Sequence, residues 1–121
     1  VDEVEENKMN KPTRFYSNRQ EKAVAKAISG KQVANSGATA FQKGDVATDR
    51  WLIECKTSIG AKASFSVKRE WLIKNAEEAF AMGKDYNALC FDFGNGSNRF
   101  YVLDEKTFIK AKEAMQNEND K

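Results

Sequence analysis

The 121-residue sequence contains no histidine, and this absence removes several kinds of catalytic site. Triads of serine, histidine and aspartate, pairs of cysteine and histidine, and histidine-ligated zinc all need an imidazole. A nuclease that uses histidine as its base is excluded for the same reason. Any chemistry must therefore use carboxylates, lysine, hydroxyl groups or a metal ion held by oxygen.

Cysteine is scarce. Cys55 and Cys90 are the two cysteines of the chain, and each lies inside an apolar, strand-like segment. A disulfide framework or a zinc site would need more ligands at close spacing. We therefore expect both residues to be small buried thiols.

Long apolar runs are also missing. No stretch approaches the length of a membrane span, and no secretory signal opens the sequence. We therefore expect no membrane association and a cytoplasmic location. A chain of this length is typical of one compact domain with a modest core.

Charge is distributed unevenly. The first eleven residues carry four acids and two lysines without apolar periodicity, so we expect 1–13 to be a flexible acidic tail. Residues 117–121 have a similar composition and are expected to be a second tail, which leaves 14–116 as a single domain. Residues 12–116 contain 17 lysines and arginines and 12 acids, a net charge of +5. This balance is compatible with a nucleic-acid partner, although solvated surface lysines produce it as well.

The first helix is predicted from a capping box at residues 17–20, where a serine is followed three positions later by glutamine. The helix should continue to about Ser29. Val24 and Ile28 form its apolar side, and Glu21 lies on the same side because it precedes them by three and seven residues. A carboxylate beside a buried stripe is unusual, although the helix dipole also favours an acid in the first turn.

Two strands follow, at 44–47 and 51–57, joined by a short polar turn. Side chains alternate between the two faces of a strand. Glu54 and Lys56 therefore share one face of the second strand, whereas Ile53 and Cys55 share the other.

The remaining elements give a mixed α/β (α+β) fold of order α-β-β-α-β-β-α, with helices packed on a mixed sheet. A second helix at about 67–82 should bury Leu72, Ala76, Ala79 and Phe80, and Trp71 should also be a core residue. Strands at 86–93 and 99–103 should form a hairpin. Asp104 should cap a last helix that runs to about Gln116 and buries Phe108, Ile109 and Met115.

The hairpin of the first two strands predicts a metal site. A tight turn would bring Asp45 beside Glu54, and a hard divalent cation such as Mg²⁺ would relieve the repulsion between the two carboxylates. The backbone carbonyl of Cys55 would be a further oxygen ligand. Lys56 would point at a metal-bound water or an anionic substrate. The alternative is a solvated hairpin edge whose charges bind nothing.

Asp45 followed by Glu54, Cys55 and Lys56 resembles the signature of the PD-(D/E)XK nucleases, with Gly44 in place of the proline. From residue 17 to 108, the order and spacing of elements is similar to that of archaeal Holliday-junction resolvases. The resemblance implies a restriction-endonuclease-like core.

The resemblance also implies a metal-dependent endonuclease that acts as a homodimer on four-way DNA junctions. Asp45 and Glu54 would bind Mg²⁺, for which Mn²⁺ can substitute, and Lys56 would assist hydrolysis. Glu21 would complete the metal site from the helix. Ser36 matches a loop serine near the scissile phosphate.

Basic residues near these motifs are candidate contacts to DNA phosphates. Solvated helix faces carry the same residue types, and this reading stays open. The candidates are Arg14, Arg19, Lys22, Lys43, Lys68 and Arg69.

Two other functions remain open at this point. One is a restriction-like, repair or nicking nuclease that acts on other DNA, because a fold does not determine a substrate. The other is a DNA-binding module that has the fold without activity. The compact form would suit an enzyme encoded by a phage or a mobile element.

Overall fold

The structure is a computed structural model that describes residues 13–33 and 45–119. In these ranges it is a mixed α+β fold with a five-stranded mixed sheet and three helices. The elements, in chain order, are α2 (Thr13–Ile28), β1 (Lys31–Gln32), β2 (Asp45–Ala47), β3 (Trp51–Lys56), α3 (Arg69–Ala81), β4 (Tyr86–Phe91), β5 (Phe100–Val102) and α4 (Glu105–Asn119).

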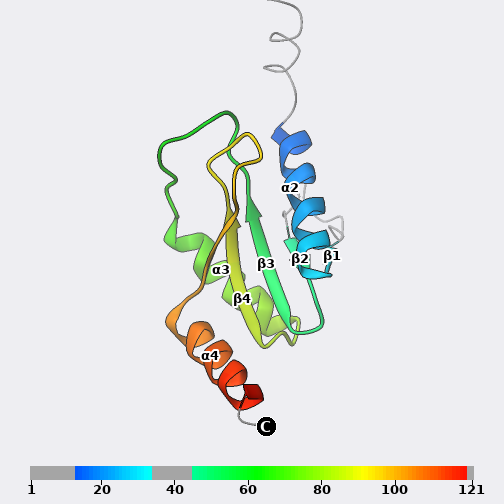
Figure 1. Cartoon of the computed structure of the whole chain (residues 1–121), viewed down its shortest axis with the longest axis vertical. Helices are drawn as coiled ribbons and strands as arrows, with labels where there is room; N and C mark the ends of the chain where they lie inside the picture. The colour runs from blue at the N-terminus through cyan, green and yellow to red at the C-terminus, as the bar shows by residue number, and fades with distance from the viewer. Residues whose placement is uncertain (1–12, 34–44, 120–121) are drawn as a thin grey trace, which may run out of the picture.

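The five strands are arranged in the sheet in chain order, β1-β2-β3-β4-β5. Three neighbouring pairs are antiparallel, whereas β3 and β4 are parallel and α3 connects them. β3 is the central strand, and because β3 and β4 are parallel, they end at the same edge of the sheet (Figure 1). The strand β1 was not predicted from the sequence. It has two residues, both exposed, and therefore shows no apolar alternation.

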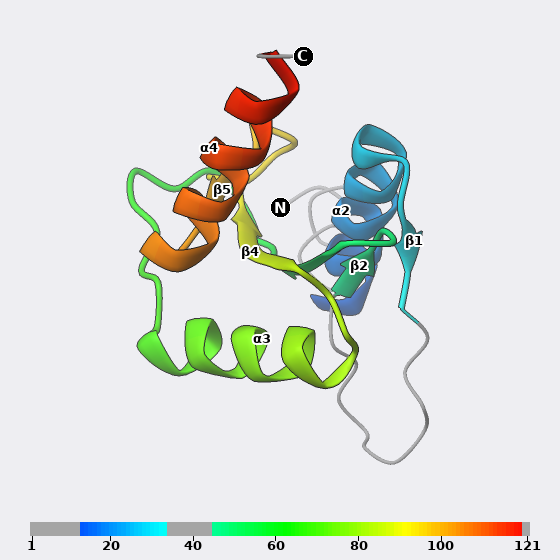
Figure 2. The ribbon, with the colours of Figure 1, turned by 90° about the horizontal axis from the view of Figure 1, so that it is seen from below.

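The main core lies between α2 and the sheet. It is built from Val24 of α2, Val46 of β2, Ile53 of β3 and, on β4, Ala88 and Cys90, all of which are buried. The alternate residues of β3 and β4 face α3 instead, which lies along the other side of the sheet (Figure 2). Because both faces are covered, β3 is buried along most of its length.

Helix boundaries depart from the expected ones. α2 begins at Thr13, so Ser17 lies inside the helix and the prediction that it caps the helix is wrong. α4 extends to Asn119, beyond the expected end at Gln116. The expected cap of α4 is confirmed, because the backbone N–H of Thr107 donates to Oδ1 of Asp104 at 2.7 Å.

The buried side of α3 also differs from the expected one. Phe80 is 88% exposed, whereas Asn75 and Ala79 are buried. Asn87 of β4 donates through Nδ2 to Oδ1 of Asn75 at 3.0 Å, so a pair of amides occupies the centre of this contact. The helix therefore faces the sheet along a line that leaves Phe80 on the solvent side.

The apolar residues expected to bury α4 are also exposed, namely Phe108, Ile109 and Met115. α4 is attached near its start, where Thr107 is buried and donates through Oγ1 to Oδ1 of Asn87 at 3.1 Å. The rest of the helix extends away from the sheet (Figure 1). Its apolar side chains are thus available on the surface of the described chain.

Candidate functional site

The two carboxylates of the hairpin lie together. The register of β2 and β3 makes Asp45 the direct cross-strand partner of Glu54, so their side chains leave the same face of the sheet. Both residues are buried, with exposed fractions of 2% and 6%. Two carboxyl groups in such a position are costly to keep charged unless cations or hydrogen bonds compensate them.

Lys56 is one such cation. Its Nζ lies 3.8 Å from Oε2 of Glu54. This proximity arises within one strand, because residues two apart share a face. An acid pair and an ammonium group therefore converge where β3 ends.

Trp71 of α3 holds the other side of the Lys56 ammonium. Nζ of Lys56 lies 4.4 Å from the centroid of the Trp71 ring, and Nζ of Lys68 lies 5.6 Å from it. A cation over the face of an indole is attracted by the ring quadrupole. Phe65 supports the indole, since its ring lies 6.1 Å from that of Trp71 and stacks on Phe91 at 4.5 Å. Trp71, which the sequence suggested as a core residue, is thus a half-buried platform for Lys56.

Glu21 is buried, as its position on the apolar side of α2 predicted. It accepts a hydrogen bond from Nε2 of Gln32 at 3.4 Å. Gln32 pairs with Val46, which faces α2, whereas the neighbouring Asp45 faces the opposite way. In the described part of the chain, no three acids or cysteines form a group able to hold a metal ion, so Glu21 does not join Asp45 and Glu54 in one.

Cys55 is buried between Glu54 and Lys56 on β3, and its side chain faces α2. It pairs with Cys90 across the parallel strands. A hydrogen bond with Cys90 and burial raise the pKa of the Cys55 thiol far above its ordinary value. Because the side chain faces α2, the backbone carbonyl is the part of Cys55 that could join Asp45 and Glu54 in a site.

The candidate phosphate contacts fall into two groups. Arg19 and Lys22 are exposed on α2, whereas Lys68 and Arg69 are exposed at the start of α3. Arg14 belongs to the first turn of α2. Ser36 and Lys43 lie outside the described residues.

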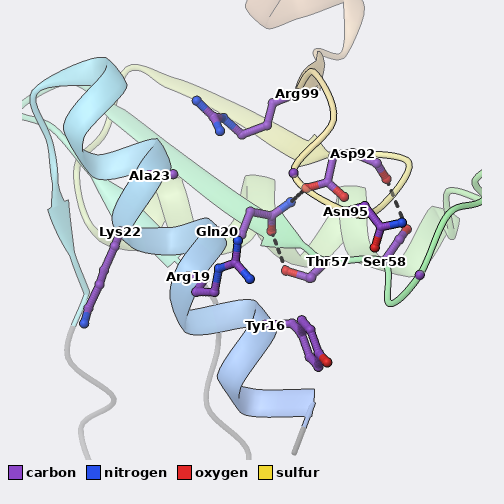
Figure 3. A pocket seen from close by; sticks show the side chains of 12 residues that line it. Tyr16, Arg19, Gln20, Lys22, Ala23, Thr57, Ser58, Asp92, Asn95 and Arg99 are labelled. Carbon is purple, nitrogen blue, oxygen red and sulfur yellow. Dashed lines mark hydrogen bonds between the residues drawn. The ribbon is translucent and has the colours of Figure 1, made fainter. Parts of the chain in front are cut away.

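A cavity of about 650 Å³ lies between α2 and the segment that joins β4 to β5. Figure 3 shows Arg19 approaching it from α2 and Arg99 from the joining segment, whereas Lys22 points away from the other labelled side chains. Gln20, Thr57 and Asp92 form its polar floor. This cavity adjoins the end of β3, because Nε2 of Gln20 donates to the carbonyl oxygen of Lys56 at 2.9 Å.

Several of these residues were not candidates in the sequence, or were candidates for another role. Arg99 carries no motif, Gln20 was interpreted as part of a capping box, and Trp71 was interpreted as packing. Asp92 had a usable signal, because it directly follows β4, and parallel strands end at the same edge of a sheet. Its position level with the end of β3 follows from that pairing.

The donor set fits Mg²⁺. This ion binds proteins through one or two carboxylates and keeps several waters, so Asp45 and Glu54 are sufficient as side-chain ligands. The carbonyl of Cys55 would be a third oxygen ligand of the same hard type.

Comparison with protein-family models, with curated proteins and with solved structures finds no match to the chain. Across residues 13–33 and 45–119, no helix has the length and apolarity that crossing a membrane requires.

Proposed function

We propose that the chain is a Mg²⁺-dependent endonuclease that hydrolyses phosphodiester bonds in DNA. The observation that supports this best is the cross-strand pair of Asp45 and Glu54, buried together with the Lys56 ammonium 3.8 Å from Glu54. A purely structural hairpin has no need of two buried acids on one face, because burial of a carboxylate is costly.

In this proposal Asp45 and Glu54 hold the metal ion, with the carbonyl of Cys55. The chemistry that Mg²⁺ supplies at such ligands is the activation of water and the compensation of phosphate charge. The cross-strand pairing fixes both carboxylates on strands rather than on loops, so that little reorganisation is needed when the substrate arrives.

Lys56 compensates the negative charge that grows on the phosphate as the bond breaks. An ammonium that is held in place before the reaction stabilises the transition state without paying for reorientation. The indole of Trp71 and the carboxylate of Glu54 hold it from two sides, at 4.4 Å from the ring centroid and 3.8 Å from Oε2. We therefore assign Trp71 as a positioning residue for Lys56.

The substitution Trp71→Leu is expected to slow cleavage about tenfold under single-turnover conditions, because a partly desolvated cation–π contact contributes about 1–2 kcal/mol. Trp71→Phe keeps an aromatic face and should retain most of the rate. NMR of the Lys56 side chain supplies a readout other than activity, since the ring current of Trp71 shifts its ε-protons. Equal rates for the Leu and Phe variants, with unchanged Lys56 shifts, would contradict the assignment.

The proposal extends to a homodimer that acts on four-way junctions. It is supported by the resemblance to archaeal Holliday-junction resolvases and by the exposed apolar side chains on α4, which a second copy would cover. Sedimentation equilibrium at micromolar concentration tests it, and a monomer that still makes paired cuts would contradict it.

A second candidate is a DNA-binding module of the same fold without activity. One observation favours it: within the described residues, Glu21 is not part of a metal-binding group with Asp45 and Glu54. The exposed basic residues at the start of α3, Lys68 and Arg69, would contact DNA equally well in such a module.

Cleavage assays distinguish the two candidates. A labelled four-way junction and a linear duplex of the same arm sequence are incubated with the protein in Mg²⁺ and in EDTA. The nuclease proposal expects cuts in Mg²⁺ alone, with the junction cut faster than the duplex. DNA binding in both conditions without any cut would support the inactive module instead.

A further inference from the structure

The cavity between α2 and the β4–β5 segment has the dimensions of a ligand site. Its volume of about 650 Å³ is within the range of small-molecule pockets. α2 supplies Tyr16, Arg19 and Gln20 to its wall, and β3 and β4 supply residues just beyond their ends (Figure 3). Pockets at the carboxyl ends of parallel strands are common ligand sites in α/β sheets.

The floor of the cavity is already ordered by hydrogen bonds. Gln20 accepts through Oε1 from Oγ1 of Thr57 at 2.8 Å and donates through Nε2 to Oδ2 of Asp92 at 3.1 Å. Oδ1 of Asp92 accepts from the backbone N–H of Gly94 at 2.9 Å, and Oγ of Ser58 donates to the carbonyl of Asp92 at 3.1 Å. These bonds tie the segment after β4 to α2 and give the pocket a preformed shape.

One close approach supports this shape. Gly94 has φ of +97°, and a Cβ at this position would overlap the carbonyl oxygen of Gly60. Gly60 and Gly94 belong to the two loops that bound the cavity, and the backbones of these loops contact each other at the two glycines. A rigid, polar floor of this kind is typical of a site that selects a ligand by fixed hydrogen-bonding groups.

The charge of the cavity favours an anion. Among the described lining residues, Arg19, Lys22 and Arg99 are cations and Asp92 is the acid. Because Lys22 points away from the other side chains (Figure 3), the two arginines and Asp92 give a net charge of +1. Asp92 is buried and already accepts two hydrogen bonds, so its charge is directed into the floor. Arg19 and Arg99 come from different elements and are both exposed residues, so a phosphate can reach them from solvent, and arginine is suited to bidentate hydrogen bonds with phosphate.

The wall also offers an aromatic ring, because Tyr16 lines the cavity on the same helix as Arg19 (Figure 3). A ligand that combines a phosphate with a planar base would use both the arginines and the ring. We infer that this cavity binds one nucleotide unit, with its phosphate between Arg19 and Arg99 and its base against Tyr16.

The position of the cavity connects this inference to the proposed function. That the nucleotide belongs to a DNA strand rests on the proposed nuclease function. Gln20 bonds both the floor of the cavity and the carbonyl of Lys56. Glu54 and Lys56 converge at the end of β3 on the face that α3 covers, whereas the cavity lies on the α2 side of the same strand end. A DNA strand with one unpaired nucleotide in the cavity would pass around the end of β3 to reach them. The cavity would then select DNA that can present an unpaired nucleotide close to the bond to be cut.

The experiment measures binding in EDTA, so that no cleavage intervenes. Four probes are used: a fluorescein-labelled single-stranded dT₈, a blunt duplex of eight base pairs, free dTMP and inorganic phosphate. The test variant is Arg19→Gln/Arg99→Gln. Its control is Lys74→Gln/Lys106→Gln, which removes the same charge from exposed positions of α3 and α4, outside the cavity. Thermal unfolding by circular dichroism verifies that both variants are folded.

The cavity variant is expected to bind dT₈ at least tenfold more weakly than the unaltered protein, whereas the control should change affinity about threefold or less. Binding of dT₈ should shift the NMR signals of the Gln20 side-chain amide and of Gly94. Tyr16→Leu should lower the affinity for dT₈ and leave the affinity for inorganic phosphate unchanged. The duplex should bind more weakly than dT₈, because its nucleotides are paired.

The two sources of the nucleotide give different results. If dTMP produces the Gln20 and Gly94 shifts and dT₈ does not, the cavity takes free nucleotides. Equal losses of dT₈ affinity in the cavity and control variants, with no shifts at Gln20, would overturn the inference. If the protein never cuts DNA but gives the expected binding results, the nuclease proposal alone is refuted. If the protein cuts DNA but does not give the expected binding results, only the nucleotide site is refuted.

Discussion

Lys56→Ala is expected to reduce the single-turnover rate of junction cleavage by about 10²–10³-fold and to leave DNA affinity nearly unchanged. Removing one preorganised electrostatic contact to the transition state typically costs this factor. Affinity depends on many phosphate contacts, of which this is one. The geometry behind the prediction is the position of Nζ, 3.8 Å from Oε2 of Glu54 and 4.4 Å from the centroid of Trp71.

Lys68→Ala is the matched control, because Lys68 also approaches the Trp71 ring, at 5.6 Å, but lies outside the strand that carries the carboxylates. Its cleavage rate should fall by less than about threefold. Binding is measured with Ca²⁺ in place of Mg²⁺, so that affinity and rate are separated. A Lys56→Ala variant that cuts at the rate of the Lys68→Ala variant would refute the role of Lys56 and weaken the nuclease proposal.

Asp45→Asn is expected to lower the affinity for Mg²⁺ and Mn²⁺ by on the order of 10²-fold and to abolish measurable cleavage. Changes in the groups that merely orient metal ligands cost about 10–100-fold in metal affinity, and loss of a ligand charge should cost at least the upper value. Asn has nearly the shape of Asp, so the buried position opposite Glu54 remains filled. Isothermal titration calorimetry with each metal measures the effect.

The control for this substitution is Asp49→Asn, which removes one carboxylate from the exposed turn between β2 and β3. Its metal affinity should equal that of the unaltered protein. If Asp45→Asn and Asp49→Asn bind metal equally well, the assignment of Asp45 as a ligand is wrong.

The sequence by itself determined those features that depend on neighbours along the chain. The pairing of Asp45 with Glu54 follows from a short turn between two strands, and the proximity of Lys56 to Glu54 follows from strand alternation. The cap at Asp104 involves residues three positions apart. The burial of Cys55 and Glu21 was visible in the apolar pattern around them.

Only the tertiary structure decided features that need two distant segments to meet. Trp71 reaches Lys56 because α3 crosses the face of β3 on which that lysine lies, and no local pattern distinguishes this indole from a core residue. Phe80 is exposed for a related reason, since the buried line of α3 is set by the amide pair of Asn75 and Asn87. Helical periodicity identifies an apolar side but cannot fix the rotation at which a helix packs.

The cavity is the clearest case of this difference. Gln20 and Asp92 are 72 positions apart, and their hydrogen bond exists because the parallel pairing of β3 with β4 brings both strand ends beside α2. The position of Asp92 after β4 places it level with the end of β3, but no pattern in the sequence indicates that Gln20 of α2 meets it there. Their meeting is a property of the sheet topology, which depends on the packing of the whole core and not on any one segment of the sequence.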